Sequence, residues 1–71
     1  MPLPLFSRVR LATDEHEADG APLGTIGSII EVYEGGAAYE IEVSDADGRT
    51  LALFAAEPAA LELVDPDESG R

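Results

Sequence analysis

Polar and apolar residues alternate strictly near the middle of the chain. In the segment Ala-Tyr-Glu-Ile-Glu-Val, the side chains of Tyr39, Ile41 and Val43 fall on one face of an extended chain. Glu40 and Glu42 fall on the other face. A period of two residues is typical of a β-strand with one buried face. We therefore predict a strand here, with Ile41 in the core and the two glutamates toward solvent.

A second apolar run, residues 24–33, precedes this strand and is joined to it by Glu-Gly-Gly-Ala at 34–37. Paired glycines supply the positive φ angles that a hairpin turn needs, so the two runs predict a β-hairpin at the centre of a small sheet. The isoleucines of the first run fall on both faces. Either a bulge at Gly27 shifts the register, or the strand is covered on both faces, with Gly24 and Gly27 allowing a tight bend.

Three further short strands are predicted at 6–11, 49–54 and 61–64. In the first of them Val9 and Leu11 share a face. Residues 44–48 read as a hairpin turn that places Gly48 in the left-handed region. Residues 57–60 read as a single 3₁₀ turn, since proline suits the first turn of a helix.

The connection at 12–23 is long and polar. Connections of about a dozen residues are uncommon in compact domains and are often functional. A weak N-cap pattern at Thr13 predicts one helical turn. The loop holds the densest group of acids outside the C-terminal tail, namely Asp14, Glu15, Glu17 and Asp19.

This order of elements predicts an all-β fold, a small five-stranded SH3-like barrel with a long first loop and a 3₁₀ turn before the last strand. We expect a single domain over residues 6–64. Residues 65–71 are charged and almost without apolar side chains, and they predict a flexible acidic tail.

Three stretches resemble a small bacterial family, namely 22–33, 38–43 and 47–53. The pattern of that family is Gly-x-x-Gly-x-Ile-Val-Glu-Val, then Tyr-x-Val-Glu-Phe, then Asp-Gly-x-Thr. It is catalogued as domain of unknown function four-nine-two-six, and the resemblance covers about residues 8–64. It implies an SH3-like barrel and supplies no catalytic residues. The glycine-led strand is also similar to the KOW motif of ribosome- and transcription-associated barrels, a weaker resemblance that implies contact with nucleic acid.

The charge of the chain is extreme. Fifteen Asp and Glu residues against four Arg give a net charge of −11. Such a surface repels phosphate backbones and anionic membranes and attracts cationic surfaces, and it also favours solubility. Cysteine is absent, and no apolar run is long enough to span a bilayer, so we expect a cytoplasmic protein that does not enter membranes.

Few residues could act in catalysis or bind a metal, and each of them has a plain structural explanation. His16 is the single histidine, with no partner for a triad, and is expected to be a solvated loop residue. Asp45 and Asp47 have a calcium-like spacing but too few companions, so a turn explains them better. Glu40 and Glu42 are expected on the polar face of the hairpin, without an apolar pocket to raise a pKa. We therefore expect no catalytic, cofactor or metal site.

These observations favour a non-enzymatic, acidic protein-interaction module. A basic partner, such as a nuclease or a toxin-like protein, would suit the charge. The alternative is that the negative charge serves only to keep the protein soluble. A KOW-like barrel that binds nucleic acid or the ribosome is the alternative function, and the acidic loops weigh against it. The candidate partner-binding acidic face comprises Asp14, Glu15, Glu17, Asp19, Glu40 and Glu42.

Overall fold

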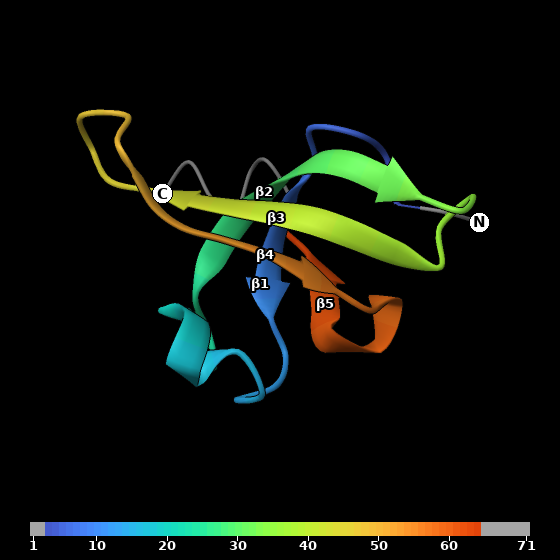
Figure 1. The fold of residues 1–71 in the computed structure, drawn as a ribbon, viewed down its shortest axis with the longest axis horizontal. Helices are drawn as coiled ribbons and strands as arrows, with labels where there is room; N and C mark the ends of the chain where they lie inside the picture. Colours follow the sequence, from blue (N-terminus) through green and yellow to red (C-terminus); the bar gives the residue numbers. More distant parts are fainter. Residues whose placement is uncertain (1–2, 65–71) are drawn as a thin grey trace.

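Five short antiparallel strands and two 3₁₀ helices make up the protein in a computed structural model that describes residues 3–64 (Figure 1). In chain order the elements are β1 (Arg8–Leu11), η1 (Glu17–Asp19), β2 (Ile26–Tyr33), β3 (Ala38–Ser44), β4 (Thr50–Ala56), η2 (Pro58–Ala60) and β5 (Leu61–Leu63). The predicted all-β fold of five strands is therefore confirmed. The predicted tail, 65–71, lies outside the described residues. Within the described part of the chain, no helix is long and apolar enough to cross a membrane.

The strands form one sheet in the order β4-β3-β2-β1-β5. The hairpin predicted at the centre of the chain is the β2–β3 pair, in which Val32 lies opposite Tyr39. In residues 3–64 the sheet is not closed between its end strands, β4 and β5, which η2 separates along the chain. The SH3-like barrel thus stays a prediction, whereas the strand count and the 3₁₀ turn before the last strand are confirmed.

One face of the sheet, which we call the inner face, holds the core. The predicted facing of β3 is confirmed, because Tyr39 and Ile41 are almost fully buried and Val43 is buried beside them. The Tyr39 hydroxyl also accepts a hydrogen bond of 2.8 Å from the backbone N–H of Leu3, which ties the start of the chain to the core. The core cluster comprises Val9, Leu11, Ala21, Ile29, Tyr39, Ile41, Val43, Ala52, Phe54, Ala56 and Ala60.

The irregularity predicted for β2 exists, but at a different residue. The register with β3 shifts between Ile29 and Glu31, so, of the two alternatives, a bulge at Gly27 is wrong. A Cβ atom on Gly27 would lie 2.8 Å from Cγ2 of Ile41 and 3.0 Å from the carbonyl oxygen of Glu42. The glycine is therefore required for close contact between β2 and β3, which a sequence pattern does not distinguish from a bulge.

The turns follow the sequence closely. Gly48 has a φ of 85°, as the left-handed position of its turn requires. The helical turn expected from Thr13 forms later, as η1. The Thr13 hydroxyl instead accepts the backbone N–H of Glu15 at 3.2 Å, a local side-chain turn that competes with helix formation.

Candidate functional site

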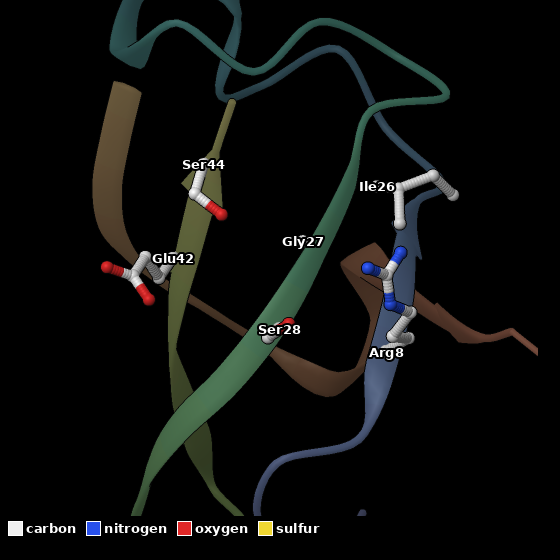
Figure 2. A pocket seen from close by; sticks show the side chains of 6 residues that line it. All are labelled: Arg8, Ile26, Gly27, Ser28, Glu42 and Ser44. Atoms are coloured by element: carbon white, nitrogen blue, oxygen red, sulfur yellow. The ribbon is translucent and has the colours of Figure 1, made fainter. Parts of the chain in front are cut away.

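Glu40 and Glu42 lie on the outer face of the sheet, opposite the core. Because side chains alternate along β3, Glu42 points away from the buried Ile41. Its neighbours across the strands are Ser28 on β2 and Leu53 on β4. A shallow hollow of about 170 Å³ crosses β1, β2 and β3 at this level. Its lining residues are Arg8, Ile26, Gly27, Ser28, Glu42 and Ser44 (Figure 2).

Arg8 and Glu42, which carry opposite charges, border this hollow on different sides. In Figure 2 the guanidinium of Arg8 lies beside Ile26 on β2, and the carboxylate of Glu42 is turned to the far side of β3. There the Thr50 hydroxyl donates a hydrogen bond of 2.6 Å to Oε2 of Glu42. The lining side chains include two hydroxyls but no histidine, cysteine or lysine that could activate them. The hollow can therefore accept hydrogen bonds and ion pairs from a docked chain.

Glu40 has a partner of its own on the outer face. The Tyr33 hydroxyl donates a hydrogen bond of 2.9 Å to Oε1 of Glu40. This hydrogen bond is the largest cause of a raised pKa for the Tyr33 phenol, followed by desolvation and by the negative charges of Glu40 and Glu31. Tyr33 is thus a half-exposed residue of the hairpin end, whereas Tyr39 is a core residue.

The acids of the first loop are held near the inner face by His16. The His16 ring stacks on Phe54 of β4, with centroids 4.6 Å apart and planes inclined by 24°. Its Nδ1 atom lies 3.2 Å from Oδ2 of Asp19. The side chain is 18% exposed, so the expectation of a solvated loop residue was wrong. The contact joins segments that are far apart in the sequence, so the pattern of neighbouring residues could not predict it.

A second hollow, of about 150 Å³, lies where the first loop meets the end of the sheet. It is lined by Glu15 and His16 of the loop, by Ala55 of β4 and by residues around η2, namely Glu57, Ala59 and Ala60. Sequence reasoning missed Glu57, because its place beside Glu15 depends on the packing of η2. Two carboxylates and an imidazole therefore border a small hollow with methyl groups around it, a lining that suits a cationic side chain.

The structure does not bring the six candidate acids onto one face. Asp14, Glu15, Glu17 and Asp19 belong to the loop that packs on Phe54 from the inner side. Glu40 and Glu42 lie on the outer face. In residues 3–64 none of the six forms an ion pair with an arginine, and the ion pair of an arginine that is seen joins Arg10 to Glu62 at 3.1 Å.

Comparison with known proteins assigns the chain to a family. Residues 5–63, most of its length, match the family described as Domain of unknown function (DUF4926). The chain belongs to this family. The resemblance of residues 22–33, 38–43 and 47–53 to this family is thereby confirmed. No curated protein and no solved structure matches the chain.

In this DUF4926 chain the calcium-like pair Asp45 and Asp47 forms a turn. Oδ1 of Asp45 accepts the backbone N–H groups of Asp47 and Arg49, each at 2.9 Å. Its carboxylate thus caps the hairpin between β3 and β4. Within residues 3–64, no group of three or more histidine, aspartate or glutamate side chains is placed to hold a metal ion.

Proposed function

We propose that this protein is a non-enzymatic interaction module whose acidic surface docks on a cationic surface of another protein. The observation that supports the proposal is the exposure of its carboxylates and their lack of arginine partners within residues 3–64. The six candidate acids are at least partly exposed, and none of them is neutralised by an arginine in the described part of the chain. Folding thus leaves their charge available to a partner, which speeds association with a cationic surface.

The same charge argues for a protein partner over nucleic acid. Binding of DNA or RNA depends on Lys and Arg that displace counterions from phosphates, and this chain has four Arg, no Lys and a net charge of −11. A basic partner such as a nuclease or a toxin-like protein fits this charge. The proposed setting is the cytoplasm, with which the absence of cysteine agrees.

The test separates the two faces. One variant neutralises the loop acids (Asp14→Asn, Glu15→Gln, Glu17→Gln, Asp19→Asn), and a second neutralises the outer face (Glu40→Gln, Glu42→Gln). A partner is captured from the native host with the wild-type protein, and association rates are then measured over a salt series. We expect the wild-type rate to fall as the Debye length shrinks to ~8 Å near physiological salt.

The variant on the docking face should associate more slowly, and the other variant should resemble the wild type. Charge that serves solubility alone predicts one salt-independent rate for all three proteins. That result would contradict the proposal.

A further inference from the structure

β4 is an end strand of the sheet with one edge unpaired. Within residues 3–64, β4 pairs with β3 along one edge, and no strand pairs with its other edge. Apart from that pairing, no backbone hydrogen bond within residues 3–64 involves Thr50–Ala56. Such an edge presents a row of N–H and C=O groups that another chain can pair with.

The side chains of β4 do not protect this edge. The strand reads Thr-Leu-Ala-Leu-Phe-Ala-Ala and contains no charged residue and no proline. Its inward side chains, such as Phe54, are buried, whereas Leu51 and Leu53 on the outer face are 64% and 54% exposed. Proteins usually guard edges with lysine, proline or bulges, so an apolar, uncharged edge marks a surface for docking.

The second half of β4 is accessible on its outer side, where Leu53 and Ala55 are exposed, whereas His16 covers Phe54 on the inner side. η1 packs against β4, and a Cβ atom on Gly20 would lie 3.5 Å from Cβ of Ala52 and 3.9 Å from the carbonyl oxygen of Leu51. The register with β3 is also irregular at the beginning of the strand, next to Ser44. From Leu53 to Ala56 the pairing with β3 is regular. The free edge of this part of β4 adjoins the hollow lined by Glu15 and Glu57.

We propose that the free edge of β4 at Leu53–Ala56 accepts an extended segment of a basic partner protein as an added strand. The proposal rests on the proposed function and assigns the docking surface for it. Charge complementarity selects this occupant. Glu15 and Glu57 border the hollow beside the edge, and Glu40 and Glu42 lie one strand further in, on β3 across from Ala55 and Leu53.

An added strand would extend both faces of the sheet at once. Because strand side chains alternate, apolar residues of the partner can lie beside Leu53 while basic residues on the other face reach Glu15 and Glu57. A second copy of this chain is a poorer occupant, because each copy has a net charge of −11 and pairing two copies would bring like charges together at the interface.

The probe is a capped peptide of seven residues, the length of β4, in which valine and lysine alternate. A control peptide has the same side chains and an N-methyl group on every backbone amide, which removes the donors of strand pairing. A second control replaces lysine with glutamate. Binding is followed by NMR titration, with amide hydrogen exchange to locate the contact.

The protein variants are matched in charge and exposure. Leu53→Lys changes the proposed surface, and Leu63→Lys changes an equally exposed leucine on β5 at the other end of the sheet. We expect the lysine peptide to protect amides of β4 from exchange. Leu53→Lys and N-methylation should each weaken binding by about tenfold or more, whereas Leu63→Lys should change it little.

Equal binding of the N-methylated peptide would overturn strand addition while leaving the acidic docking function intact. Protection of β5 instead of β4, or equal binding of the glutamate peptide, would also overturn it. Sedimentation showing a dimer with protected β4 amides would assign the edge to a second copy and overturn the proposed occupant. Lack of binding by either lysine peptide at low salt would contradict both this proposal and the charge argument beneath it.

Discussion

The imidazole of His16 lies flat against the ring of Phe54, with the ring centroids 4.6 Å apart. Phe54 belongs to the core face of β4, and His16 comes immediately before η1 in the acidic loop. The stack therefore holds the acidic loop against the end strand of the sheet. His16 also lines the hollow that Glu15 and Glu57 border.

Removing this stack should loosen the loop. We expect His16→Ala to lower the free energy of unfolding by about 0.5–1.5 kcal/mol, the usual range for stacked aromatic pairs beyond their buried area. Asp19→Asn, which keeps the ring and removes the carboxylate beside Nδ1, is the matched control and should cost less. Chemical denaturation measures both. Equal losses would mean that the contact with Asp19, rather than the stack, positions the loop.

The close approach of β2 and β3 at Gly27 should not tolerate a side chain. Gly27→Ala places a methyl group 2.8 Å from Cγ2 of Ile41 and 3.0 Å from the carbonyl oxygen of Glu42. Overpacking of this kind costs about 1–3 kcal/mol. Ser28→Ala, on the outer face of the same strand, should change stability far less. A Gly27→Ala variant as stable as the wild type would show that β2 and β3 can move apart freely.

The two faces of β3 should differ sharply in their contribution to stability. Ile41 is fully buried, and Ile41→Ala should cost about 2–5 kcal/mol. Glu40→Ala removes a half-exposed carboxylate that accepts one hydrogen bond from Tyr33, and should change stability by less than about 1 kcal/mol. Urea titrations compare the two variants. Similar losses would contradict the assignment of inner and outer faces.

Phe6 adopts a backbone conformation that large side chains avoid. Its φ is 68°, although the ring is 72% exposed and gains little from packing. Asparagine tolerates this region better, so Phe6→Asn should raise the free energy of unfolding by about 0.5–1 kcal/mol. The measurement is the thermal midpoint. A lower midpoint would show that the Phe6 ring makes a contact worth more than the strain.

Tyr33 should titrate above the ordinary phenol pKa of about 10. The neutral hydroxyl donates to Glu40, and the hydrogen bond is lost on ionisation, so the pKa is raised in the folded protein. This contribution to stability is therefore complete below the unfolded pKa and is lost as the pH rises through the folded one. Glu40→Gln should lower the Tyr33 pKa toward its ordinary value, as followed by NMR of the ring. An unchanged pKa in that variant would mean that desolvation, rather than Glu40, is the cause.

Local pattern was sufficient wherever the physical cause is local. The alternation in residues 38–43 determined which side chains of β3 are buried, because successive residues of any strand point to opposite faces. The position of Gly48 in its turn and the 3₁₀ helix after Glu57 likewise follow from glycine and proline chemistry. The resemblance to the family in residues 22–33, 38–43 and 47–53 was likewise carried by glycines and apolar positions.

Tertiary structure alone decided what depends on contacts between distant segments. It placed the bulge of β2 at Ile30, put Gly27 against Ile41, and left β4 as an end strand. It also placed the loop acids and the pair Glu40 and Glu42 on opposite faces. The sequence by itself determined the strands, the turns and the acidic charge. Which carboxylates lie together was decided by packing across the sheet, because side chains distant in the chain meet only once the strands have paired.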